Sequence, residues 1–281
     1  MRKFCLIGHP LGHSLSPQIH SRLFELSGKA AEYTLCDIAP EELTGKFGEL
    51  AEFEGFNITI PHKMAIIDYC DELSPEAKRY NSVNCVKNGS KKVGYNTDCI
   101  GFTKSIEKLG ASLKSKVLLI GCGGVGRMAA IETAIQGGEL SVAVLKSDLP
   151  LVEKVTEEIH GLAPDAHVRV VIIGEDGLTA SALNNEKFDL LINCTPVGMF
   201  PKTDNMPCAA DVLGNVSAVF DLIYNPRETL LTKTAREKGC KALNGMAMLV
   251  LQAVAAHEIW DGDSYNKADI DRLISDMEDL V

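Results

Sequence analysis

The chain has 281 residues, of which 46% are hydrophobic and 23% are charged, and its formal net charge at pH 7 is −10. This length allows two domains with a sizeable core, and the composition is that of a soluble globular protein. The acidic balance argues against nucleic acid or an anionic membrane surface as a partner. Nine scattered cysteines without a Cys-x-x-Cys pair argue against a disulfide framework or a zinc site. We therefore expect a cytoplasmic monomer or homodimer without a metal or a membrane span, acting on a small molecule.

Strand and helix signals alternate through the first hundred residues. Phe4–Ile7 predicts a strand, followed by a helix with Ser16 as its N-cap and Pro17 at its first position. The pattern then predicts strands at Tyr33–Cys36 and Phe56–Ile60, a helix at Glu41–Glu54, and a hairpin of Val83–Lys87 with Lys92–Tyr95 around Asn88-Gly89. Asp98 is placed to cap a helix that runs to about Leu109.

From Lys116 onward the chain alternates regularly between short apolar runs and helical segments. The runs predict parallel strands at Val117–Ile120, Leu140–Leu145, Val168–Ile173, Leu190–Cys194 and Ala218–Leu222. The helices between them are expected near Val125–Gln136, Leu149–Ile159 and Leu230–Glu237. After Gly239 the pattern predicts two helices, Met246–Trp260 and Lys267–Leu280, which return to the first domain. The fold class is therefore α/β: a doubly wound Rossmann domain over residues 103–243, and an α/β domain of residues 1–102 plus 244–281.

A glycine-rich loop follows the strand Val117–Ile120. Gly121 would make the tight turn, Gly123 would admit a pyrophosphate close to the backbone, and Gly126 would let the next helix pack near the strand. Gly124 and Val125 open that helix, so its N-terminus would face the phosphates. The sequence therefore predicts a dinucleotide site.

The end of the next strand normally selects between the two nicotinamide dinucleotides. Lys146 and Ser147 favour the 2′-phosphate of NADP, whereas Asp148 favours the ribose hydroxyls of NAD. We expect NADP, with NAD as the alternative.

Short polar clusters elsewhere supply hydroxyl and amide groups, one lysine and one carboxylate. These groups suit a polyhydroxylated substrate that exchanges a hydride with a nicotinamide. The side chains concerned are Ser14, Ser16, Thr59, Lys63, Asn84, Asp98, Tyr224 and Gln252.

Taken in order, the clusters resemble the shikimate dehydrogenase family over residues 8 to about 262. The matching runs begin with Gly8-His-Pro-Leu-Gly-His-Ser14-Leu-Ser16-Pro17, Asn57-Ile-Thr59-Ile-Pro-His-Lys63 and Asn96-Thr-Asp98-Cys-Ile-Gly101. They continue with Asn193-Cys-Thr195-Pro-Val-Gly-Met199, Asp221-Leu-Ile-Tyr224-Asn-Pro226 and Gly245-Met-Ala-Met-Leu249 with Gln252.

This resemblance implies the reversible, NADP-dependent reduction of 3-dehydroshikimate to shikimate, a step of aromatic amino acid biosynthesis. It implies that Lys63 and Asp98 form the catalytic pair and that Ser14 and Ser16 hold the substrate carboxylate. Thr59, Asn84, Asp98 and Gln252 would hold the ring hydroxyls, with Tyr224 also in contact. The cofactor would be held by Gly121, Gly123, Gly124, Val125, Gly126, Lys146, Ser147, Thr195, Met199 and Gly245.

A lysine beside a carboxylate stays charged near neutrality, so Lys63 suits protonation of a developing alkoxide better than base catalysis. We therefore expect oxidation of the alcohol to be favoured at alkaline pH.

The chain departs from the family pattern at two places. Cys85 stands where the family usually has a hydroxyl residue, and Leu145-Lys146-Ser147 stands where it usually has Asn-Arg-Thr. These departures leave an NAD-dependent quinate or shikimate paralogue as the alternative. A non-catalytic dinucleotide-binding sensor is a further alternative, and the retained Lys63–Asp98 pair argues against it. A folate-linked dehydrogenase would have a similar domain plan, but the paired Ser14 and Ser16 argue against that assignment.

Overall fold

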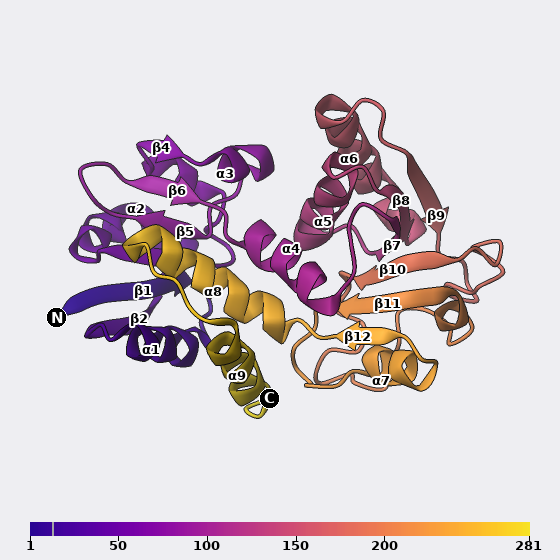
Figure 1. Cartoon of the computed structure of the whole chain (residues 1–281). Helices are drawn as coiled ribbons and strands as arrows, with labels where there is room; N and C mark the ends of the chain where they lie inside the picture. Colours follow the sequence, from indigo (N-terminus) through magenta and orange to yellow (C-terminus); the bar gives the residue numbers. More distant parts are fainter. Residues whose placement is uncertain (13) are drawn as a thin grey trace. The chain divides into compact units, whose positions relative to one another are not determined.

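The computed structural model describes residues 1–12 and 14–281, so His13 of the opening motif lies outside the described residues. The chain forms two compact units, Met1–Gly101 with Leu249–Met277 and Phe102–Met248 with Glu278–Val281. Each unit is built on its own six-stranded sheet, and Figure 1 shows the strands of both, with labels on all but β3. The α/β architecture expected from the alternating pattern is confirmed.

The sheet of the first unit is mixed, with strand order β2-β1-β3-β5-β6-β4. Its strands are β1 (Arg2–Gly8), β2 (Ala31–Asp37), β3 (Gly55–Ile58), β4 (Glu72–Leu73), β5 (Cys85–Lys87) and β6 (Val93–Tyr95). Strand β1 pairs in parallel with β2 and β3, and β5 and β6 form the predicted antiparallel hairpin. The helices of this part of the chain are α1 (Ser16–Ser27), α2 (Leu43–Lys46) and α3 (Pro75–Tyr80).

Two local expectations for the first unit are wrong. Ser16 is the first residue of α1 rather than its cap, and Leu15 occupies the cap position without a side-chain hydrogen bond. The segment expected as one helix, Glu41–Glu54, consists of the short α2 between two 3₁₀ turns, Pro40–Glu42 and Phe47–Glu52. Gly45 and Gly48 lie in this segment, and glycine is a poor helix former because it loses the most backbone freedom on folding.

The sheet of the second unit is entirely parallel, with order β12-β11-β10-β7-β8-β9. Its strands are β7 (Lys116–Ile120), β8 (Glu139–Val144), β9 (Val168–Ile172), β10 (Phe188–Asn193), β11 (Val216–Asp221) and β12 (Lys241–Leu243). Read from β9 the order is 3-2-1-4-5-6, that of a Rossmann sheet. Strand β12 is not predicted by the sequence pattern, which ends the series at β11.

Helices link the strands of the second unit and lead back to the first. They are α4 (Asp98–Leu109), α5 (Gly124–Ile135), α6 (Leu149–Leu162), α7 (Leu230–Glu237), α8 (Met246–Asp261) and α9 (Lys267–Glu278). Helices α5 and α6 pack against each other, and α7 packs on β11 and β12. The buried strands β7 and β10 form the centre of this sheet and of its apolar core.

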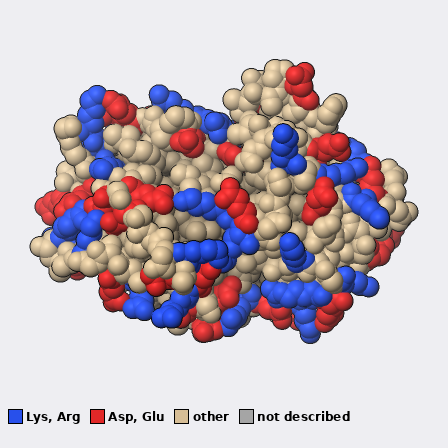
Figure 2. Space-filling view, viewed as in Figure 1, with Lys and Arg blue, Asp and Glu red and all other residues tan. Residues whose placement is uncertain are grey.

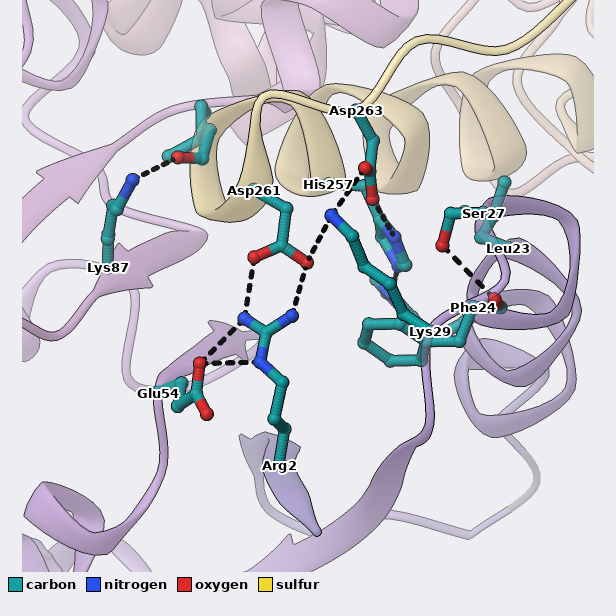
Figure 3. A network of polar contacts seen from close by, with 12 residues as sticks. Arg2, Leu23, Phe24, Ser27, Lys29, Glu54, Lys87, His257, Asp261 and Asp263 are labelled. Atoms are coloured by element: carbon teal, nitrogen blue, oxygen red, sulfur yellow. Dashed lines mark hydrogen bonds and ion pairs between the residues drawn. The ribbon is translucent and has the colours of Figure 1, made fainter.

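The end of α8 is fixed within the first unit by packing and by charge. Trp260 donates its indole N–H to the Val86 carbonyl at 2.9 Å, and a Cβ at Gly55 would lie 2.3 Å from the indole nitrogen. Arg2 forms a two-pronged pair with Asp261, at 2.5 and 2.7 Å, and also contacts Glu54 (Figure 3). The glycine at position 55 is therefore required by the close approach of the tryptophan ring.

Acidic and basic side chains are interspersed over the face drawn in Figure 2. Within the described residues, no helix combines the length and the apolar run needed to cross a membrane.

Candidate active site

A lysine and a carboxylate meet in the first unit. Lys63 Nζ donates to Asp98 Oδ2 at 2.7 Å, and the two side chains are 27% and 20% exposed. Asn84 donates from Nδ2 to the other oxygen, Asp98 Oδ1, at 2.9 Å. The pair is thus partly shielded yet accessible, and each carboxylate oxygen has its own partner.

Asp98 is available to Lys63 because another residue caps helix α4. The side-chain oxygen of Asn96 accepts the backbone N–H groups of Asp98 and Cys99, at 3.1 and 3.4 Å. The expectation that Asp98 itself caps this helix is therefore wrong, since it stands in the first turn. Its negative charge there is favourable toward the helix dipole.

Asn84 is held rigidly by its neighbours. Its Oδ1 accepts the Thr97 backbone N–H at 2.6 Å, and its Nδ2 also donates to Thr97 Oγ1 at 3.0 Å. Both amide hydrogens are therefore used within the protein, and Asn84 and Thr97 are almost fully buried. Thr97 Oγ1 also donates to Gln252 Oε1 at 3.3 Å, which brings Gln252 of α8 into the same network. Thr97 was not among the expected site residues, although it stands between two of them in the chain.

Ser14 and Thr59 lie on the loops that follow β1 and β3, and Ser16 begins helix α1. Ser14 Oγ accepts the Ser16 backbone N–H at 3.2 Å, and Ser16 is buried at the start of α1. Thr59 follows β3, and a Cβ on Gly8 would lie 2.4 Å from its methyl group, so the two loops touch. Tyr224 belongs to the second unit, where it is half-buried just after β11.

The glycine-rich loop of the second unit has room where a phosphate would need it. Gly121 has φ +87°, and a Cβ at Gly126 would lie 2.4 Å from the Gly121 carbonyl oxygen, so both positions need glycine for the fold itself. A Cβ at Gly123 or Gly124 would meet no described atom within 4 Å. Gly123 is the N-cap of α5, whose first N–H groups face this open space. The loop therefore fits a pyrophosphate at a helix N-terminus.

The charges at the end of β8 are mixed. Lys146 and Ser147 are exposed in the 3₁₀ turn Lys146–Asp148, and the Ser147 hydroxyl donates to Asp148 Oδ1 at 3.2 Å. A cation, a hydroxyl and a carboxylate thus stand together where the adenosine ribose of a dinucleotide binds in Rossmann domains.

A buried hydrogen-bond network joins two of the family-like runs and supports the motif after β10. Asp221 is fully buried and accepts from Thr229 Oγ1 at 2.6 Å, Asn193 Nδ2 at 3.0 Å and the Ile223 N–H at 3.2 Å. Burial raises its pKa to about 6, against the lowering effect of these donors. Asn193 Oδ1 in turn accepts from the hydroxyl and the N–H of Thr195, at 2.7 and 3.0 Å.

Three further expected cofactor residues also belong to the second unit. Thr195 is half-buried and oriented by Asn193, while Met199 is 46% exposed. A Cβ at Gly245 would lie 2.0 Å from the Leu222 carbonyl oxygen, so glycine is required there by the packing of the chain.

The chain is similar to known proteins over most of its length. A family model described as the shikimate dehydrogenase substrate binding domain matches residues 6–86. The NADP(+) shikimate dehydrogenase of Caldanaerobacter subterraneus subsp. tengcongensis is 38% identical over 275 residues, covering 94% of this chain and 93% of the relative.

Solved structures are similar over the whole length. Shikimate 5-dehydrogenase of Thermus thermophilus, in complex with NADP(H) and shikimate, has a TM-score of 0.83 at 30% identity, covering 98% of this chain and 99% of that one. The Listeria monocytogenes enzyme, in complex with shikimate and NAD, has a TM-score of 0.87 at 28% identity, covering 99% and 96%. The chain therefore belongs to the shikimate dehydrogenase family.

Proposed function

We propose that this protein catalyses the NADP-dependent reduction of 3-dehydroshikimate to shikimate, and the reverse oxidation, in aromatic amino acid biosynthesis. The observation that carries the proposal is the Lys63–Asp98–Asn84 network, in a chain that shares its family with curated NADP(+) shikimate dehydrogenases. The Rossmann order of the second sheet and the open space at Gly123 fit the dinucleotide.

The roles of the substrate residues follow from their donors and acceptors. Ser14 and Ser16 hold the substrate carboxylate, while Thr59, Gln252 and Asp98 hold ring hydroxyls, with Tyr224 in contact. Asn84 has both amide hydrogens engaged, and its oxygen accepts from the backbone N–H and the hydroxyl of Thr97, so it acts chiefly by holding Asp98.

The nicotinamide supplies the hydride for the reduction. Lys63 Nζ gives a proton to the oxygen of the reacting carbonyl as negative charge develops there. Asp98 orients the ammonium group through the 2.7 Å bond. The glycine-rich loop with Val125 binds the phosphates, Lys146 and Ser147 bind the 2′-phosphate, and Thr195, Met199 and Gly245 line the nicotinamide side.

Removal of the ammonium group tests the catalytic role. We expect Lys63→Ala to lower kcat by about 10²- to 10⁴-fold with a modest change in the KM for shikimate, because proton transfer is lost. Lys91→Ala is the matched control, since Lys91 is an exposed lysine of the same unit paired with Glu72. Near-normal turnover of Lys63→Ala in steady-state assays would exclude Lys63 from the reaction.

The same assignment predicts a pH dependence. Oxidation of shikimate requires Lys63 to take up a proton, so we expect kcat for oxidation to rise between pH 7 and pH 10, while reduction proceeds well near neutrality. A pH–rate profile for oxidation that stays flat over this interval would contradict the role of Lys63 as the proton donor in reduction.

A second candidate is an NAD-dependent paralogue acting on quinate as well as shikimate. The carboxylate of Asp148 beside Lys146 favours it, because an acidic group at this point binds the ribose hydroxyls of NAD. Lysine offers a point charge where the family usually has the two-pronged guanidinium of arginine.

A further inference from the structure

The two loops that carry the proposed substrate groups are both tied to the end of strand β2. Asp37 is the last residue of β2 and pairs in register with Gly8, the last residue of β1. One carboxylate oxygen of Asp37 accepts the Leu11 backbone N–H at 2.8 Å, and the other accepts from His9 Nδ1 at 2.6 Å. Asp37 thus holds the chain that leads from β1 to Ser14 and Ser16.

The next residue, Ile38, holds the other loop. The Ile38 carbonyl accepts from His62 Nε2 at 2.6 Å, and His62 is almost fully buried directly before Lys63. Because a carbonyl can only accept, Nε2 carries the hydrogen and the bond fixes the orientation of the ring. The Ile38 N–H donates to the Gly8 carbonyl at 3.0 Å, so one residue binds both loops.

The two loops also bond to each other. The His9 N–H donates to the Ile60 carbonyl at 3.0 Å, and the Thr59 N–H donates to the Ile7 carbonyl at 2.9 Å. The carbonyl of Lys63 accepts the Val83 N–H at 2.8 Å, immediately before Asn84. The groups proposed to bind the substrate carboxylate and to transfer the proton are therefore joined through a short set of hydrogen bonds.

We propose that Asp37 and His62 are positioning residues, which set the substrate-carboxylate loop and the Lys63 loop against a common anchor at the end of β2. This inference rests on the proposed function for the identity of the substrate. Asp37 acts through Leu11 and His9 on the loop of Ser14 and Ser16, and His62 acts on Lys63. The pKa of Asp37 is lowered, first by the Leu11 N–H and then by His9, as expected of a carboxylate that accepts these bonds in its charged form.

The two positioning residues have different kinetic signatures. Loss of the Asp37 anchor should weaken binding of the substrate carboxylate, which does not react, and so raise KM. Displacement of Lys63 should lower kcat, because misplacement by about 1 Å can cost about 10²-fold in rate. A merely structural role would instead change both kinetic parameters of each variant together with its thermal stability.

For Asp37 we would compare Asp37→Ala and Asp37→Asn with Glu32→Ala, a control at an exposed acidic residue of the same strand. We expect Asp37→Ala to raise the KM for shikimate about tenfold with kcat within about twofold of wild type. Asp37→Asn should restore most of the affinity, because its amide oxygen can accept from Leu11 and its amide N–H can donate to His9. A KM for Asp37→Ala equal to that of Glu32→Ala would overturn the role of Asp37.

Amide hydrogen exchange at Leu11 gives a second readout that needs no turnover. The Leu11 N–H should exchange at least about tenfold faster in Asp37→Ala than in wild type, because its acceptor is gone. Unchanged exchange would refute the anchor, whereas absence of shikimate oxidation by the wild type would refute the proposed function alone. The two failures are thereby distinguished.

For His62 the decisive pair is His62→Gln and His62→Phe. Gln can donate to the Ile38 carbonyl from a similar position, while Phe fills the buried volume without a donor. We expect near-normal kcat for His62→Gln and a 10- to 100-fold lower kcat for His62→Phe, with the dissociation constant for NADP unchanged in both. Equal kcat values in the two variants would overturn the role of His62.

Discussion

At the scale of single residues, Asp221 is a buried carboxylate whose hydrogen-bond partners among the described residues are neutral donors: Thr229, Asn193 and the Ile223 N–H. Its pKa of about 6 lies above the usual value for aspartate, because burial disfavours the charged form. The native state therefore binds more protons at this group than the unfolded state between about pH 4 and pH 6. Its contribution to stability is complete at lower pH and is lost as the pH rises through about 6.

The loss of this stability contribution with rising pH can be tested by comparing Asp221→Asn with wild type. Asparagine removes the titration, so the free energy of unfolding of the variant relative to wild type should rise by about 2 kcal/mol from pH 4 to pH 8. Urea unfolding at several pH values measures that difference and cancels the titration of all other groups. A difference that is independent of pH would show that Asp221 is not perturbed by burial.

The sequence assigned Lys63, Asn84 and Asp98 to one site, whereas the individual hydrogen bonds around them could not be predicted. Lys63, Asn84 and Asp98 are joined as expected of neighbours in one site. The sequence favours Asp98 as the cap of α4 because an acidic residue at a helix start is a good cap, yet Asn96 accepts the bonds. Asn96 Nδ2 also donates to the Ser82 carbonyl at 3.0 Å, and this contact with a residue 14 positions away is not visible in the local sequence.

At the scale of elements, the β7–α5 junction contains glycines that the fold requires, Gly121 and Gly126, and glycines proposed to serve the cofactor, Gly123 and Gly124. We expect Gly123→Ala to leave thermal stability near that of wild type, because the new methyl group meets no described atom within 4 Å. Its dissociation constant for NADP should rise at least about tenfold, because the methyl group enters the space for the pyrophosphate.

Gly161→Ala in α6 is the matched control for Gly123→Ala, since that position is equally open and lies within a helix. It should leave NADP binding unchanged and stabilise the protein by about 0.5–1 kcal/mol. Calorimetric titration measures both dissociation constants. Unchanged NADP affinity in Gly123→Ala would mean that the dinucleotide does not bind at this loop.

Element prediction was accurate where the pattern is long and failed where it is short. The central strands β7 and β10 are largely apolar runs, and parallel strands buried on both faces require such runs. Strand β12 has only Lys241–Leu243, and its pairing with β11 makes it a strand. The same limit applies to Glu41–Glu54, where the apolar spacing fits a helix and two glycines interrupt it.

At the scale of the whole molecule, the order of the motifs along the chain was the most informative feature of the sequence. The fold class followed from β-α alternation, and the family followed from polar runs that lie in both units. The mixed order of the first sheet, with β4 beyond β6, could not be predicted, because β4 is a two-residue strand defined by its pairing alone.

The most direct test of the whole account is the initial rate of oxidation of shikimate and of quinate by the intact protein, each with NADP and with NAD. We predict the highest kcat/KM for shikimate with NADP, because shikimate is the proposed substrate and Lys146 and Ser147 are proposed to receive the 2′-phosphate. A higher kcat/KM with NAD or with quinate, or no oxidation of shikimate at all, would contradict the account.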